Sequence, residues 1–210
     1  MRVLFIIVVV VFGLGFGGCG IGKSYIDLRK PIYFVTEQSF FKGCESSPVG
    51  EASCRESRRQ IVKDGVAQWL NYFEEHARPF VGVVADIDEL PYETDNPPIH
   101  LSVEKDECDK PVSISVLACY RSGGFFSDPR IIFTAPNSEN ITSNMMAHEF
   151  GHALWGNGDH YNHEDGSPSI MSEIVPVYGG VISSDVDRLC RVRGDCPKRK
   201  HARKIGRGKK

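Results

Sequence analysis

The sequence lacks several features that would point to other classes of protein. None of its 7 cysteines forms a Cys-x-x-Cys pair, which argues against a zinc site built from thiolates. No internal repeat is present, and 210 residues are enough for a single domain with a proper hydrophobic core. The apolar run over residues 3–12 is too short to span a bilayer. These absences leave a single-domain protein without a membrane-spanning segment at its start.

The chain begins with the order of segments that is typical of exported proteins. A charged start at Arg2 precedes the apolar run and a glycine-rich stretch that ends before Cys19. This order predicts a signal peptide over residues 1–18 and a tether over residues 19–30. The residues FGGC that end at Cys19 resemble the lipobox of bacterial lipoproteins, which implies a lipidated cysteine that anchors the chain in the cell-envelope membrane. The alternative is a secreted protein, with Cys19 discarded as part of an ordinary signal peptide.

The remaining cysteines support export independently. Six are left once Cys19 is set aside, and an even number of cysteines in an exported chain predicts disulfide bonds. Because a short loop costs the least entropy to close, neighbouring cysteines are the expected partners. The predicted pairs are Cys44–Cys54, Cys108–Cys119 and Cys190–Cys196.

One short stretch, AHEFGHALWGNGDH from Ala147 to His160, carries residues with metal chemistry. His148 and His152 are four residues apart, so on a helix their rings lie on one face and both reach the same ion. Zinc accepts such nitrogens in a tetrahedral shell, and a catalytic site supplies three protein ligands and leaves the fourth position to water. Glu149 lies beside this face. The HExxH spacing therefore predicts two zinc ligands and a general base.

Residues further along the chain make this motif more specific. Gly156 stands where a glycine can turn the chain after the helix, and Ser169–Ser172, with the sequence SIMS, brings a methionine downstream. Together with the segment His148–Leu154, these residues resemble the metzincin metalloproteases, and their matrixin-like branch most closely. The resemblance implies a catalytic zinc ion, Glu149 as general base, and Met171 in a Met-turn beneath the metal.

The chain departs from the metzincin pattern after the second histidine. The pattern HExxHxxGxxH would place a glycine and a histidine at the positions that hold Trp155 and Gly158 here. We therefore expect the helix to run about one residue longer, with Gly156 as its turn.

Three residues are candidates for the third zinc ligand. Counting from the turn at Gly156 selects Asp159 or its neighbour His160, whereas the matrixin-like interval to Met171 selects His163. We favour His160, because neutral imidazole is the commoner ligand and lies next to the position that the glycine selects. Asp159 and His163 stay open as alternatives.

The rest of the sequence predicts strands and helices around one core. Arg58–His76 repeats apolar residues every three or four positions, which predicts a helix, and residues 40–57 are expected to form a loop. Asn137 or Ser138 can cap the helix that carries the site, and a short amphipathic helix is expected after Val181. Strands are predicted over residues 31–36, 80–85, 99–103, 112–119 and 130–134.

This pattern predicts an α/β (α+β) fold with about five strands. The resemblance implies a metzincin-like catalytic domain over residues 31–196, with a site helix, a Met-turn and a C-terminal helix. It also implies a mixed sheet whose antiparallel edge strand lines the cleft. His100, in one of the predicted strands, is expected to be a structural histidine and not a ligand.

Charge is distributed unevenly along the chain. Of the 25 basic residues, eight lie in the tail over residues 197–210, which has no acid, so the first 196 residues carry 17 basic against 27 acidic side chains. Such a tail is usually disordered; it can bind anionic surfaces or remain solvated, and no specific nucleic-acid recognition is expected. The acidic, proline-rich segment Asp86–Pro98 offers carboxylates for a structural Ca²⁺, with a solvated turn as the simpler explanation.

The sequence therefore predicts a zinc-dependent metalloendopeptidase that acts on a protein or peptide substrate. Glu149 would take a proton from the attacking water and pass it to the leaving amine. Some metzincins add a tyrosine two residues after the Met-turn methionine, but Glu173 holds that position, so Tyr161 and Tyr178 are weaker candidates for that role. Glu173 is also disfavoured as a gluzincin-type third ligand, because it follows the Met-turn. The alternative, from a different class, is a non-catalytic cell-surface binding lipoprotein that keeps the metzincin fold.

Overall fold

The computed structural model describes residues 26–104, 118–123, 127–134, 141–156, 160–164, 166–173, 175–176 and 178–200. The predicted signal peptide over residues 1–18, Cys19 and residues 201–210 of the basic tail lie outside these ranges. Five other residues named above, Cys108, Asn137, Ser138, Gly158 and Asp159, also lie outside them. Among the described residues, no helix combines the length and the apolar character needed to cross a membrane.

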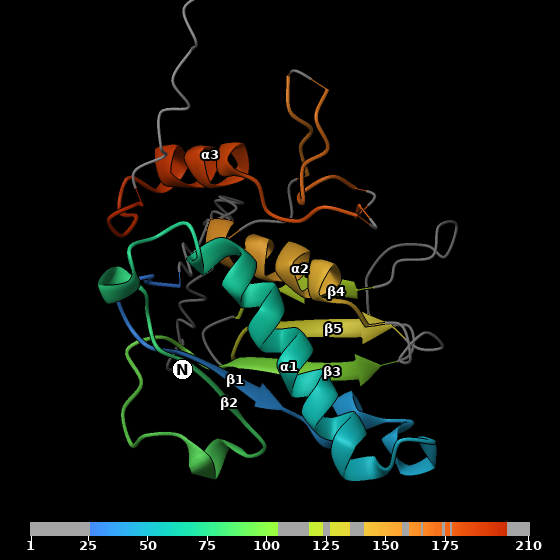
Figure 1. Ribbon diagram of the computed structural model, residues 1–210. Coiled ribbons are helices and arrows are strands. Elements are labelled where there is room, and N and C mark those ends of the chain that lie inside the picture. The colour runs from blue at the N-terminus through green and yellow to red at the C-terminus, as the bar shows by residue number, and fades with distance from the viewer. Residues whose placement is uncertain are drawn as a thin grey trace, which may run out of the picture.

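A five-stranded mixed sheet forms the centre of the fold, in the order β2-β1-β3-β5-β4 (Figure 1). The four strands β1, β2, β3 and β5 are parallel, and β4 pairs antiparallel with β5 at the edge. This confirms the predicted α/β (α+β) class and the antiparallel edge strand. The strands are β1 (Ile32–Thr36), β2 (Val81–Val84), β3 (Ile99–Glu104), β4 (Ala118–Arg121) and β5 (Arg130–Thr134). Strand β4 shares only Ala118 and Cys119 with the predicted strand 112–119, whose earlier residues are not described.

The two faces of this sheet differ in polarity. Along β3, Leu101 and Val103 are buried and lie on the same face, because side chains alternate along a strand. Helices α1 (Glu51–Leu70) and α2 (Ser143–Trp155) cover this apolar face and pack against each other (Figure 1). His100 lies on the opposite face, 3.4 Å from a carboxylate oxygen of Glu37 and 3.5 Å from one of Asp128. These carboxylate neighbours are what a structural histidine is expected to have.

Helix α1 begins and ends earlier than the prediction of Arg58–His76. Its first residues, which we expected in a loop, include good helix formers, and Arg55 forms an ion pair of 2.7 Å with Glu51 one turn before it. The helix ends at Leu70, and residues 75–77 form a separate 3-10 turn. The predicted apolar stripe is confirmed, since Val62, Val66 and Trp69 are fully buried.

Helices α1 and α2 approach each other closely because α1 has a glycine at their contact. A Cβ atom on Gly65 would lie 2.6 Å from Cβ of Met146 and 2.8 Å from the carbonyl oxygen of Ser143. Four residues later in α1, the indole N–H of Trp69 donates a hydrogen bond of 2.8 Å to the carbonyl of Ala147. This contact holds α2 one residue before His148.

The two ends of α2 are set by local signals. The hydroxyl of Thr142 accepts a hydrogen bond of 3.2 Å from the N–H of Met145 and caps the helix. The predicted caps Asn137 and Ser138 are therefore wrong, because a cap must directly precede the first turn. At the other end Gly156 adopts a left-handed conformation, with φ of 68°, and its N–H donates to the carbonyl of His152 at 2.8 Å. This confirms the longer helix with Gly156 as its turn.

The predicted C-terminal helix is present as α3 (Ser183–Arg193), which lies beyond α2 on the side away from the sheet (Figure 1). The Arg193 side chain is 1% exposed and donates hydrogen bonds of 2.8 Å to the carbonyls of Leu154 and Ile26. It thereby ties α3 to the end of α2 and to the first described residue. The remaining short helices are η1 (Gln38–Phe41), η2 (Cys44–Ser46), η3 (Glu75–Ala77) and η4 (Ile87–Glu89).

Two of the predicted disulfide bonds are present. Cys44 bonds to Cys54, and Cys190 bonds to Cys196. Cys119 is also disulfide-bonded, and its predicted partner Cys108 is outside the described residues. Disulfide bonds persist in oxidising compartments, so they indicate an exported or extracellular protein.

Candidate metal centre

Three imidazole rings converge at the C-terminal half of α2. His148 and His152 project from one face of this helix, with ring centroids 4.7 Å apart, and His160 stacks on His148 at 5.1 Å. Nε2 of His148 lies 3.1 Å from Nε2 of His152 and 3.2 Å from Nε2 of His160. Within the described part of the chain, no other group of three or more His, Cys, Asp or Glu side chains brings its ligand atoms together in this way. The structure thus brings together the three residues that the sequence favoured as ligands.

The surroundings of His148 indicate that the three rings bind a cation and are not joined to one another by hydrogen bonds. Its Nδ1 lies 2.7 Å from the carbonyl oxygen of Ile170, and because a carbonyl can only accept, Nδ1 carries the hydrogen and Nε2 presents a lone pair. One lone pair that faces two ring nitrogens cannot accept good hydrogen bonds from both, whereas one cation can bind all three. Burial lowers the pKa of His148 to about 4, which keeps the ring in the neutral form that binds metals.

The nitrogen separations also fit a small divalent cation. Zinc holds imidazole nitrogens at about 2.0–2.1 Å in a tetrahedral shell, so two ligating nitrogens lie about 3.4 Å apart. The observed separations of 3.1 Å and 3.2 Å are a few tenths shorter. Imidazole also suits copper, iron and nickel. The geometry therefore supports a transition-metal ion without selecting zinc among them.

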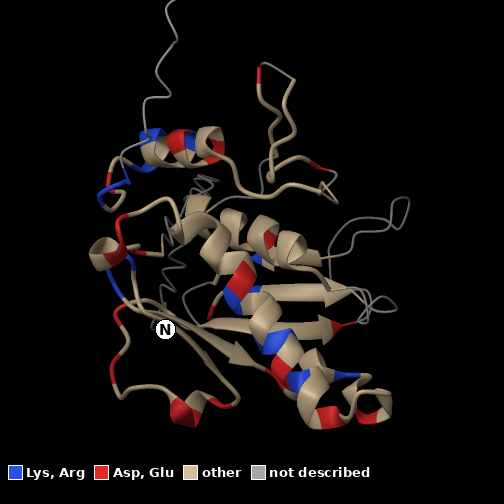
Figure 2. Cartoon of the chain, in the orientation of Figure 1, with Lys and Arg blue, Asp and Glu red and all other residues tan. Residues whose placement is uncertain are grey.

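A buried carboxylate directly follows His148 in α2. Glu149 is the only Asp, Glu, Lys or Arg residue of α2, so it accounts for the red segment of that helix in Figure 2, and it is 4% exposed. Burial raises the pKa of Glu149 to about 8, and a hydrogen bond from the backbone of Tyr120 in β4 partly opposes that rise. Its Oε2 atom is buried and has no hydrogen-bond partner among the described residues. Such an orphaned oxygen is what a nearby water molecule would satisfy.

The segment Ser169–Ser172 lies against α2 and holds two of the histidines in place. Besides the contact from Ile170 to His148, the carbonyl of Met171 accepts a hydrogen bond of 3.0 Å from the N–H of Tyr161, which follows His160. Met171 is fully buried, and a Cβ atom on Gly151 would clash with its sulfur. Gly151 is thus the residue of α2 against which the methionine packs.

The other sequence candidates lie elsewhere. Nε2 of His163 is 2.9 Å from a carboxylate oxygen of Asp185, so this ring is paired away from the three histidines. The hydroxyl of Tyr161 donates to the same carboxylate at 2.9 Å. Tyr178 is 88% exposed, Glu173 is exposed, and neither belongs to the converging group. The predicted calcium site in Asp86–Pro98 shows no converging set of three acidic side chains, and Ca²⁺ there stays a prediction.

Asp185 is a residue that the sequence analysis did not single out. It is fully buried at the start of α3 and accepts hydrogen bonds from Tyr161, His163 and the hydroxyl of Ser169, the last at 2.6 Å, as well as from the N–H of Ile182 at 2.9 Å. In the sequence, Asp185 is recognisable only as an acidic residue in the first turn of a helix. That position accounts for its hydrogen bond from the N–H of Ile182 but not for its contacts with Tyr161, His163 and Ser169.

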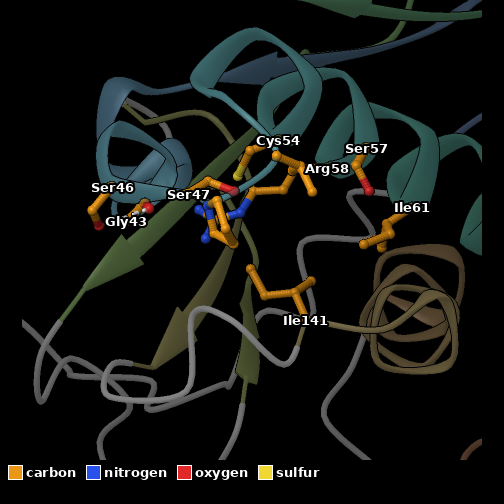
Figure 3. A pocket seen from close by; sticks show the side chains of 10 residues that line it. Gly43, Ser46, Ser47, Cys54, Ser57, Arg58, Ile61 and Ile141 are labelled. Atoms are coloured by element: carbon orange, nitrogen blue, oxygen red, sulfur yellow. Dashed lines mark hydrogen bonds between the residues drawn. The ribbon is translucent and has the colours of Figure 1, made fainter.

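A hollow lies away from the histidines. It has a volume of about 320 Å³ and lies between the loop closed by Cys44–Cys54, the start of α1 and the segment before α2. Figure 3 shows Arg58 and Ile141 among its lining side chains. The Arg58 guanidinium donates to the carbonyls of Phe40 and Lys42, so it serves to fasten this loop. None of the three histidines lines the hollow.

A scan against models of known protein families and a search of curated proteins both found no match. The geometry of the histidine cluster and its surroundings is therefore what indicates a function.

Proposed function

We propose that this protein is a metzincin-like zinc metalloendopeptidase in which His148, His152 and His160 hold the metal. Three ring nitrogens meet at a helix that also carries a buried carboxylate with one unsatisfied oxygen, and this observation carries the proposal. Three protein ligands with a carboxylate at the open side are what a catalytic zinc site requires, whereas a structural site closes its shell with a fourth protein ligand. Met171 packed beneath α2 is consistent with a Met-turn.

Bound zinc would polarise the scissile carbonyl and acidify the attacking water. The positive charge of a bound ion would favour the ionised carboxylate of Glu149 and so oppose the rise of its pKa by burial. Glu149 could then take the proton from that water through Oε2, while the backbone N–H of Tyr120 holds the carboxylate in position. The same carboxylate can return the proton to the leaving amine, which is the general acid–base role. His148 is oriented for its part by the Ile170 carbonyl.

A peptide substrate is supported by the sheet edge beside this carboxylate. Strand β4 pairs with β5 on one side and contributes Tyr120, whose backbone contacts Glu149. An edge strand offers backbone N–H and C=O groups to an extended peptide, which can add to the sheet as a further strand. A substrate bound in this way would run past the catalytic residues.

We also propose that the protein acts in the cell envelope, attached through a lipidated Cys19. The disulfide bonds support export. A lipid chain and a basic segment together anchor a protein better than either does alone, so the tail over residues 197–210 would add to attachment at an anionic surface. Cells can be fed a radioactive or clickable fatty acid and the label on the protein measured. Label that is present on the unaltered protein and absent from Cys19→Ser would support this anchor, whereas a soluble mature chain that begins at another residue would contradict it.

The test of the catalytic proposal separates metal binding from turnover. The purified full chain should contain about one zinc ion per molecule, and Glu149→Gln should keep that zinc while losing peptide hydrolysis by roughly two to four orders of magnitude. Glu173→Gln is the matched control, because it makes the same change at an exposed residue and should leave both properties unchanged.

Two outcomes would overturn the proposal in different ways. Absence of zinc after gentle purification, together with no binding of added zinc, would remove the metal site. Zinc binding without cleavage of a broad peptide library by the unaltered protein would favour the non-catalytic binding lipoprotein.

A further inference from the structure

The segment that returns the chain to the metal centre is held by aromatic packing where the metzincin pattern has a glycine. Trp155 occupies that position, and its ring packs edge-on against Trp69 of α1 and against Tyr161, both at 5.4 Å between centroids. Trp155 therefore links helix α1 to the residue that directly follows His160. A glycine at this position could not form either contact.

Tyr161 is fixed from several directions. Its backbone N–H donates to the Met171 carbonyl at 3.0 Å, and its hydroxyl donates to Asp185 at 2.9 Å. The guanidinium of Arg188 lies over its ring, 4.0 Å from the centroid. A side chain that contacts α2, α3 and the Ser169–Ser172 segment at once has little freedom to move.

His160 presents the contrasting case. It is exposed, although its ring touches those of His148 and His152 at 5.1 Å and 5.0 Å between centroids. An exposed ligand on an irregular segment needs support from its neighbours if its nitrogen is to stay within a few tenths of an ångström of the metal. Both the backbone N–H and the side chain of Tyr161 are held. The neighbouring His160 therefore has few positions and ring orientations open to it.

We propose that Tyr161 is a positioning residue that presents His160 to the metal, with Trp155, Asp185 and Arg188 as its clamp. The inference depends on the proposed function only in taking the three histidines as metal ligands. The clamp explains how the chain closes the site at His160 despite the altered spacing after His152. The Tyr161 hydroxyl is engaged by Asp185, so its role is to hold the chain and not to touch the reacting atoms.

The inference is tested by metal affinity and by the spectrum of Co²⁺, which reports the ligand set directly. We compare the full-length chain with Tyr161→Phe, which removes only the hydroxyl. The expected result is an affinity for Co²⁺ and Zn²⁺ that is about tenfold weaker, together with a weaker or shifted Co²⁺ ligand-field absorption, because supporting residues typically change metal affinity about 10–100-fold. Arg188→Gln should weaken affinity by about two- to fivefold through loss of the cation–π contact.

Tyr72→Phe is the matched control. It also removes one tyrosine hydroxyl that donates a hydrogen bond, but the acceptor is the Val181 carbonyl, at 2.9 Å, and not a residue of the segment that holds His160. Thermal unfolding of the metal-free proteins should shift by similar amounts in the two tyrosine variants, while only Tyr161→Phe changes the metal affinity and the spectrum.

The outcomes distinguish this inference from the proposed function. Equal metal affinity and equal Co²⁺ spectra in Tyr161→Phe, Tyr72→Phe and the unaltered protein would overturn the positioning role and leave the enzyme proposal standing. An unaltered protein that binds neither ion would overturn both. If Tyr161→Phe unfolds, the metal affinity of Arg188→Gln tests the positioning role instead. Arg188 is exposed, so the variant should fold, and an unchanged metal affinity would contradict the clamp.

Discussion

The two halves of the histidine cluster are built by different means. His148, Glu149 and His152 lie on α2, and all three are buried in a helix that packs against the apolar face of the sheet. His160 lies on an irregular segment and is exposed, so its placement depends on contacts made by its neighbours. In the first half the backbone hydrogen bonds of the helix set the spacing, whereas in the second half no regular structure does.

This difference shows where the site is tolerant and where it is not. The spacing of His148 and His152 survives any substitution that leaves the helix intact. The position of His160 depends on Tyr161, Asp185 and the carbonyl of Met171, which come from three separate parts of the chain. We therefore expect changes to the return segment to affect metal binding more than they affect the stability of the fold.

The largest expected effect comes from removing a proposed ligand from either half. His148→Ala and His160→Ala should each weaken zinc affinity by more than about 100-fold, because loss of a ligand exceeds the roughly 10–100-fold change of a supporting residue. His163→Ala, which leaves the three nitrogens in place, should stay within that smaller range. Competition with a chelator of known affinity measures all three. If His160→Ala leaves the zinc affinity unchanged while His163→Ala lowers it strongly, His163 and not His160 is the third ligand.

The next effect tests the packing beneath the helical half. An alanine normally stabilises a helix by up to about 1 kcal/mol relative to glycine, but a Cβ atom on Gly151 would clash with the Met171 sulfur. Gly151→Ala should therefore destabilise the protein by about 1–3 kcal/mol, measured by urea unfolding.

Its control is the same change in a Met171→Ala background, where the clash with sulfur is absent and the cost should shrink. A stabilising Gly151→Ala in the unaltered protein would mean that the methionine does not pack against the helix there.

The smallest effect tests the turn that joins the two halves. Gly156 has φ of 68°, a conformation that costs an alanine about 1–2 kcal/mol. Gly156→Ala should lower stability by about that amount and also weaken zinc affinity, because it alters the path from α2 to His160. Gly194→Ala is the matched control, since Gly194 caps α3 with φ of 73° far from the metal ligands in sequence. Equal zinc affinity in the two variants would mean that the turn does not govern the return segment.

Much of the fold was accessible from local patterns. The strands Ile32–Thr36 and Arg130–Thr134 and the apolar stripe of α1 follow from residue periodicity, and two short-range disulfide bonds follow from loop entropy. The predicted start of α1 and the predicted cap of α2 are wrong. The helix formers in Glu51–Ser57 extend α1 into the segment that the cysteines mark as a loop, and Thr142, which directly precedes the first turn of α2, caps that helix in place of Asn137 or Ser138.

The sequence by itself determined the helical half of the site, because a spacing of four residues places His148 and His152 on one face of any helix. It also determined the turn at Gly156, since glycine alone adopts a left-handed conformation without strain. Only the tertiary structure decided which of His160, His163 and Tyr161 lies against the other two histidines. Their roles depend on which side chain meets the buried carboxylate of Asp185 and which meets the other histidines, and those contacts join residues that no local periodicity relates.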